Sequence, residues 1–313
     1  MKEGAVTFAD PRLRDLDPRP SPLPASLVRA REGLARSTPL LLSIPDSALE
    51  REWSWVGEGD GDIRSGFYLA IQAFESAAAQ LMRSLAASAV GPAAGSIGAA
   101  TEARWDLHGL LASLAEESLD AEPGAGEWTI RRTLAHTLSS QRAYTWFGAW
   151  WMRRRDDADY PLHIPEDVAD QMEAQIPQVE RNADGALADI RARLDALVDL
   201  TSELWRDASE EDLAVRARWM GFPVTTGFRV GRWSTHMQEH TIQIEKTLAL
   251  LGRAPTEVER MVRLVYRAFG RLEGAPLGVP AMASGSGGAA EVIEAAVAEV
   301  AGIAQEVAEA ATS

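Results

Sequence analysis

The sequence predicts an all-α protein, and three observations carry this prediction. Long stretches such as DIRSGFYLAIQAFESAAAQLMRSL repeat apolar residues every three or four positions, which gives a helix one apolar face. No segment sustains the alternation of apolar and polar residues that is typical of strands. Glycine and proline follow the ends of several helical stretches, where a helix would stop. Several long helices in one chain favour a helical bundle.

The N-terminal part of the chain predicts a polar segment followed by a helical extension. Residues 1–24 are polar and rich in proline, so we expect them to be poorly ordered. Residues 25–99 predict a helical hairpin that is interrupted near Pro45, and the small residues and glycines of 86–100 indicate a linker or loose hairpin. This extension shares a helix–loop–helix outline with residues 111–144, so it is a candidate degenerate half-bundle.

Residues 100–252 predict a four-helix bundle. Thr129 is the expected N-cap of the second helix, and Gly252 ends the fourth, with a proline following. The four expected helical stretches cover residues 101–119, 128–155, 178–205 and 226–252.

Residues 253–313 predict C-terminal helices that are joined by a flexible linker over 276–288. Thr256 and Glu259 resemble a capping box at the start of the first of these helices. The last helix carries a narrow apolar stripe, which suits a helix that docks on the protein or associates with a second copy, so a homodimer is allowed. A marginally stable, alanine-rich terminal helix is the alternative. The stripe consists of Ile293, Val297, Val300, Ile303 and Val307.

Composition excludes several classes of function. The chain has no cysteine, which excludes disulfides, cysteine-bound zinc, iron–sulfur clusters and a cysteine nucleophile. The formal net charge of −15 argues against nucleic acid as a partner. No basic-then-apolar leader and no apolar run of bilayer length is present, so we expect a cytoplasmic protein without a membrane partner.

The histidines carry the strongest chemical signal. His236 and His240 are four residues apart on one expected helix, so both imidazoles can face the same point. His136, inside the second bundle helix, could join them, and three neutral imidazoles can hold a catalytic divalent ion with a position left open. The alternative is that these side chains are satisfied core residues. We interpret His108 and His163 as non-ligands.

Two motifs resemble a known family. GEWTIRRTLAHTLSSQRAY resembles the second helix, and RVGRWSTHMQEHTIQIEKTLALLG the fourth helix, of the DinB-like (YfiT-like) metal-binding four-helix-bundle superfamily. The resemblance covers residues 100–252 and implies that His136, His236 and His240 ligate zinc, with nickel or iron as alternatives. Members include transferases and isomerases that depend on mycothiol, bacillithiol or glutathione, and many members have no known activity. Ile242 stands where the sulfoxide-synthase relatives have a glutamate, which argues against that branch.

Side chains near the histidines suggest how a substrate would be held. Arg229 and Arg232 can share a helix face with His236 and could bind an anionic substrate, although ion pairs with acidic neighbours would also explain them. Gln243 and Ser140, three and four residues past a histidine, could orient the imidazoles.

Tryptophans could form an apolar pocket wall beside the histidines, or they could simply belong to the core. Trp128, Trp146 and Trp233 are the main candidates, and Trp150, Trp151 and Trp219 are further ones.

These features lead to two functional hypotheses. The first is a DinB-like metal-dependent enzyme that acts on a small electrophilic substrate with a low-molecular-weight thiol, such as mycothiol or bacillithiol, or with a metal-activated water. The second is a non-catalytic, metal-stabilised helical bundle with a stress-response or protein-interaction role. The sequence selects neither the substrate nor the physiological metal.

Overall fold

The computed structural model of the chain describes residues 10–19, 23–56, 58–85, 90–279 and 287–313. It divides into two compact units, each assembled from separate stretches of sequence. Unit 1 comprises Met1–Pro22, Val90–Ala100 and Ala115–Arg253, and unit 2 comprises Leu23–Ala89, Thr101–Leu114 and Ala254–Ser313.

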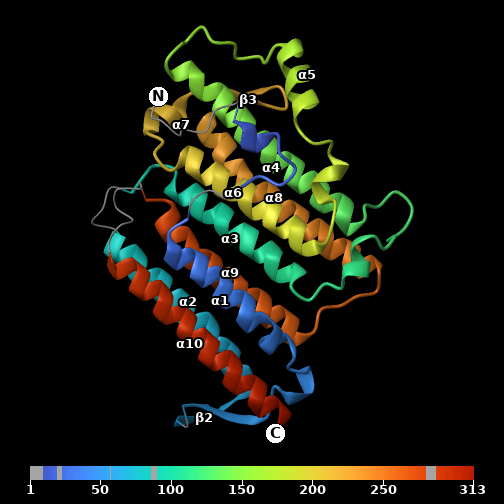
Figure 1. Cartoon of the computed structure of the whole chain (residues 1–313), viewed down its shortest axis with the longest axis vertical. Coiled ribbons are helices and arrows are strands. Elements are labelled where there is room, and N and C mark those ends of the chain that lie inside the picture. The colour runs from blue at the N-terminus through green and yellow to red at the C-terminus, as the bar shows by residue number, and fades with distance from the viewer. Residues whose placement is uncertain (1–9, 20–22, 57, 86–89, 280–286) are drawn as a thin grey trace. The chain divides into compact units, whose positions relative to one another are not determined.

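Helices dominate both units, which confirms the all-α class (Figure 1). The α-helices are α1 (Ala25–Leu42), α2 (Ile63–Leu85), α3 (Ala94–Leu111), α4 (Ile130–Met152), α5 (Glu166–Gln175), α6 (Leu187–Trp205), α7 (Glu210–Ala214), α8 (Thr226–Leu250), α9 (Glu257–Leu277) and α10 (Gly287–Thr312). Short 3-10 turns are η1 (Pro11–Leu13), η2 (Asp46–Ala48), η3 (Glu116–Leu119), η4 (Arg153–Arg155) and η5 (Glu180–Ala183). Within the described residues, no helix has the length and apolar composition that a bilayer span requires.

Two short antiparallel hairpins interrupt the helices, and the sequence did not predict them. They pair β1 (Glu52–Trp55) with β2 (Glu58–Asp62), and β3 (Arg216–Trp219) with β4 (Phe222–Thr225). Strands of four or five residues are too short for a period-2 pattern to stand out. The turn between β3 and β4 places Met220 and Gly221 at φ of 44° and 85°, the left-handed pair that a tight hairpin turn requires.

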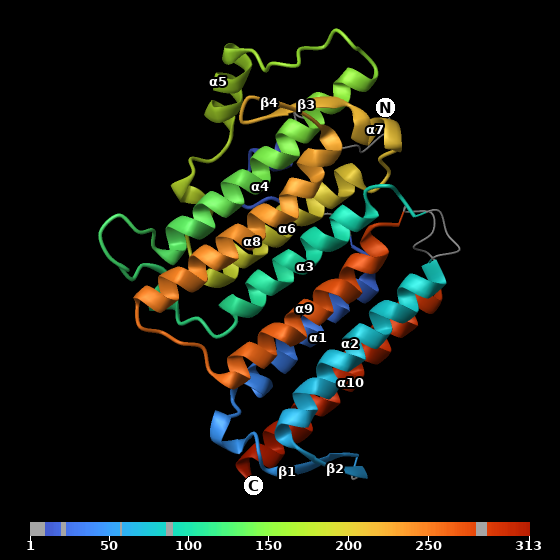
Figure 2. The ribbon, with the colours of Figure 1, turned by 180° about the vertical axis from the view of Figure 1, so that it is seen from behind.

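Unit 1 is built around α4, which packs against α6 and α8 (Figure 2). The helix starts where the sequence predicted, because the Thr129 side chain accepts a hydrogen bond from the backbone N–H of Arg132. Helix α8 also ends as predicted, with Gly252 at a φ of 73°. These two helix termini set the register of the face that α4 and α8 share.

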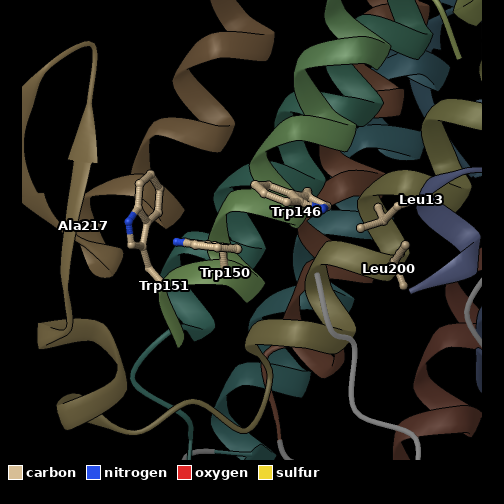
Figure 3. Close-up of a cluster of buried hydrophobic side chains, with 6 residues drawn as sticks. All are labelled: Leu13, Trp146, Trp150, Trp151, Leu200 and Ala217. Carbon is tan, nitrogen blue, oxygen red and sulfur yellow. The ribbon is translucent and has the colours of Figure 1, made fainter. Parts of the chain in front are cut away.

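A buried aromatic cluster fixes the far end of α4. Figure 3 shows Trp146 beside Leu13 and Leu200, with Trp150 and Trp151 further along the helix. Side chains of the segment after α4, together with α5, cover this cluster, because Tyr160, Leu162, Ile164, Val168 and Met172 pack against it.

The described residues 10–19 make defined contacts in unit 1, whereas the sequence predicted poor order for residues 1–24. Leu13 is buried, and the Arg142 guanidinium donates hydrogen bonds to the carbonyl oxygens of Leu13 and Asp15, at 2.7 and 2.9 Å. These contacts hold Leu13 and Asp15 against α4. Residues 1–9 and 20–22 lie outside the described part of the chain.

Unit 2 combines helices from both ends of the chain. Helix α2 packs against α9 and α10, and α1 packs against the same two helices. The predicted apolar stripe of the last helix is docked in this unit, since Ile293, Val300, Ile303 and Val307 are buried. Helices that the sequence divided between two extensions therefore share one core. The degenerate half-bundle origin of residues 25–99 stays a prediction.

Both predicted linkers are shorter than expected. Helix α3 begins at Ala94, inside the expected linker over 86–100. Helix α9 continues through Pro276 to Leu277, and α10 already begins at Gly287. Pro276 has no N–H for a helical hydrogen bond and its ring crowds the preceding turn, and α9 ends one residue later. Residues 86–89 and 280–286 lie outside the described residues.

We expect Gly109→Ala to destabilise unit 2 by about 1–3 kcal/mol, because a core position would be overpacked. A Cβ at Gly109 would lie 2.9 Å from the Cα of Arg263 on α9, which cannot move without shifting a helix. Gly98→Ala is the control on the same helix, in the part of α3 that belongs to unit 1, since nothing lies within 4 Å of its Cβ and alanine favours the helix. Urea unfolding measures both variants, and equal stability in the two would contradict the close approach of α3 and α9.

Candidate metal centre

The three predicted histidines come together in unit 1. His136 projects from α4, and His236 and His240 project from α8, one helical turn apart. One nitrogen of each ring lies within 4.8 Å of a nitrogen of the others, and His236 Nε2 lies 3.1 Å from His240 Nε2. Within the described residues, this group could hold a metal ion, whereas His108 and His163 lie outside it.

The spacing of the His236 and His240 nitrogens fits a divalent ion. Nitrogen ligands at 2.0–2.1 Å in a tetrahedral site lie about 3.3 Å from one another, close to the separation of His236 and His240. Gln243 lies where the sequence placed it, because its Oε1 is 2.9 Å from His240 Nδ1 and accepts that N–H. This bond leaves the lone pair of His240 on Nε2, which faces the other histidines. Ser140 makes a longer contact of 3.4 Å to His136 Nε2.

The surroundings keep all three imidazoles neutral. Burial, together with the neighbouring His240 and His136, lowers the pKa of His236 to about 3. The pKa of His136 is lowered by burial and by His240. The pKa of His240 is lowered by burial, against the opposing effect of its bond to Gln243. Neutral imidazole is the form that binds metal, so the environment favours a ligand set at neutral pH.

The metal-free protein should lose stability as the pH falls below 6.5. The folded pKa of His236 lies near 3, below its ordinary value of 6.5, so the unfolded chain binds more protons between these limits. The contribution of neutral His236 to the free energy of unfolding is complete above pH 6.5 and is lost as the pH falls toward 3. Urea midpoints of the chelator-treated protein across this range measure it. His236→Asn should flatten the curve, and an identical pH dependence in the variant would refute the burial of a neutral His236.

Tyr144 is a neighbour of the histidines that the sequence analysis missed. Its ring meets the His236 ring edge-on, with the centroids 5.5 Å apart. Burial raises the pKa of the Tyr144 phenol, so it stays protonated at neutral pH. A signal for it was present, because Ser140 and Tyr144 follow His136 at intervals of four residues on α4 and therefore share its face.

The two candidate arginines have different surroundings. Arg232 forms a bidentate ion pair with Glu239, with both N–O distances at 2.6 Å. Of the two explanations that the sequence allowed for this arginine, the ion pair with an acidic neighbour is therefore the one observed. Arg229 has no ion-pair partner among the described residues, and its guanidinium lies over the ring of Tyr144 at 4.9 Å. Only Arg229 of these two therefore offers an uncompensated charge near the histidines.

The candidate tryptophans are distributed over several environments. Trp128 lies beside the histidines, with its ring 5.4 Å from that of His136. Trp146 instead belongs to the core cluster around Leu13 and Leu200 (Figure 3). Trp233 is 1 % exposed and is a core residue as well. The spacing of tryptophans along a helix cannot separate these cases, because core tryptophans and pocket tryptophans occur at the same intervals in the sequence.

The further tryptophan candidates lie at the other end of α4 and on the β3–β4 hairpin. Trp150 and Trp151 donate from Nε1 to the carbonyl oxygens of Pro161 and Leu162. Trp219 lies under the guanidinium of Arg232, at 5.5 Å.

The part of the chain that carries the three histidines matches a known protein family. Residues 99–244 match the family model of the DinB superfamily, and this range contains His136, His236 and His240. No curated protein and no solved structure matches the chain.

Proposed function

Because residues 99–244 belong to the DinB superfamily, we propose that this protein is a metal-dependent enzyme with His136, His236 and His240 as its ligands. Zinc is the expected ion, since three imidazoles and an open position form a common catalytic zinc site. The reaction is the transfer or activation of a low-molecular-weight thiol, or of water, against a small electrophilic substrate. The convergence of three neutral imidazoles within 4.8 Å carries this proposal.

A divalent ion in this place would supply Lewis acidity and would lower the pKa of a coordinated thiol or water. The chain's own residues contribute orientation and charge. Gln243 accepts the Nδ1 proton of His240 and so fixes the ring and its tautomer. The Tyr144 phenol keeps its proton beside His236, and Arg229 supplies a positive charge next to that phenol. Trp128 provides an apolar edge against His136.

Metal analysis of the purified protein, followed by cobalt substitution, tests the proposal. We expect one equivalent of metal and a visible cobalt spectrum that changes when mycothiol or bacillithiol is added. A bound cobalt ion whose spectrum responds to neither thiol nor pH would contradict the enzyme and would favour the non-catalytic bundle. Failure of the wild-type protein to bind any divalent ion would contradict both.

A further inference from the structure

A cavity of about 240 Å³ lies in unit 1, between the end of α4, the segment after it, the β3–β4 hairpin and the start of α8. Three of its lining residues are Arg229, Arg218 and His163, and none of the described lining residues is acidic. The others are apolar: Phe147, Trp151, Leu162, Ile164 and Met220. The lining of the cavity therefore combines apolar side chains with basic ones.

Arg229 is the partly buried cation of this cavity. Its guanidinium carbon lies 5.4 Å from the ring centroids of both Phe147 and Trp151, in addition to its contact with Tyr144. Its Nε is buried and has no hydrogen-bond partner within the described residues. Burial lowers the pKa of Arg229 to about 10, which reflects the loss of water around the charge. Aromatic faces attract a cation, but they accept none of its N–H bonds in the way a carboxylate does.

The neighbouring arginines are already engaged. Arg218 donates a hydrogen bond to the carbonyl oxygen of Gly221 in its own hairpin turn. Arg232 is paired with Glu239 and does not line the cavity. Arg229 is thus the arginine whose donors and charge a ligand would complete.

We propose that this cavity binds the carboxylate of a small organic acid with an apolar body, and that Arg229 receives the carboxylate. A planar guanidinium matches a carboxylate with two parallel hydrogen bonds. Phe147, Trp151 and Ile164 would contact the apolar body. A phosphate fits less well, because its oxygens need more donors and the described lining residues carry no hydroxyl or amide side chain.

This inference rests on the proposed function in one respect, namely that the bound acid is the substrate of the histidine centre. Arg229 and His236 are seven residues apart on α8, about 10 Å along the helix axis. Tyr144 contacts both side chains. Phe147 and Trp151 lie beyond Tyr144 on α4, farther from His136, so the carboxylate of an acid held at Arg229 would be its end nearer to the metal centre.

Binding of 4-fluorobenzoate to the metal-free, full-length protein tests the cavity separately from the metal. Fluorine NMR of the ligand and calorimetry at low ionic strength report its affinity. We expect 4-fluorobenzamide, which has the same shape without the charge, to bind about 10- to 100-fold more weakly. This comparison uses only the wild-type protein, so it does not depend on the folding of a variant. Equal affinity for the two compounds would overturn the proposal.

Matched variants then identify the arginine. Arg229→Gln should weaken 4-fluorobenzoate about 10- to 100-fold. Arg232→Gln, three residues away, should change the affinity less than about twofold, because this arginine is paired with Glu239. Weakening by Arg232→Gln alone, or displacement of the benzoate by equimolar inorganic phosphate, would refute the assignment. If the protein binds benzoate but no divalent metal, the proposed acid-binding cavity is supported and the proposed metal-dependent enzyme is contradicted.

Discussion

Replacing His240 by alanine is expected to lower the affinity for zinc by more than about 100-fold. Removing a residue that only orients a metal ligand typically costs about 10- to 100-fold, and removing the ligand itself should cost more. His240 Nε2 faces His236 Nε2 at 3.1 Å, and its ring is held by Gln243. Competition with a zinc indicator on the purified protein measures the affinity. His136→Ala should have the same effect, since its ring lies 4.7 Å from that of His240.

Two control variants make this result specific. Gln243→Leu removes only the bond that fixes the His240 ring, so its loss of affinity should be about 10- to 100-fold. His163→Asn removes a histidine of the same unit that lies outside the cluster, and zinc binding should not change. Wild-type zinc affinity in His240→Ala would mean that His236 and His240 are core residues that hydrogen-bond to each other.

Glu273→Gln is expected to destabilise unit 2 by about 3–5 kcal/mol, because it leaves buried positive charge without its counter-charge. Glu273 and Arg104 are both fully buried and form an ion pair. Arg31 adds a second charged contact at 2.5 Å, and the indole of Trp105 donates to the same carboxylate at 2.6 Å. Hydrogen exchange in α9 together with urea unfolding measures the loss.

The matched control for this variant is Glu102→Gln on the surface of the same unit. Glu102 pairs with Arg271 at 2.9 Å, but both side chains are partly exposed, so the change should cost no more than about 1 kcal/mol. Similar losses in the two variants would contradict a special role for the buried carboxylate.

The buried carboxylate also sets a pH dependence. Burial alone would raise the pKa of Glu273, but the charges of Arg104 and Arg31 and the hydrogen bonds to the carboxylate together lower it. A lowered folded pKa gives stability that is complete above the ordinary value of 4.5 and is lost as the pH falls further.

The histidine cluster was predictable because it depends on local spacing. His236 and His240 needed only the helical repeat, and the motif around His136 supplied the partner helix. The cavity was not predictable, because it depends on two segments without a periodic signal. His163 reached it from a proline-containing loop, and Arg218 reached it from a hairpin of four-residue strands.

The same limit applies to the fold. Thr129, Gly252 and the Thr256–Glu259 capping box act within one or two helical turns, and the structure confirms all three. The arrangement of unit 2 depends on contacts between residues far apart in sequence, such as Glu273 with Arg31. A single sequence carries no direct record of such pairs.

The division of unit 2 between the two ends of the chain has a consequence for synthesis on the ribosome. Roughly 170 residues separate the end of α2 from the start of α9, which at ordinary translation speeds is about 10–30 s. During that interval the apolar faces of α1 and α2 have been made, but the helices that cover them have not. The nascent N-terminal helices are therefore natural clients for a chaperone, and a ribosome that stalls before α9 would release a chain with an unprotected, aggregation-prone surface.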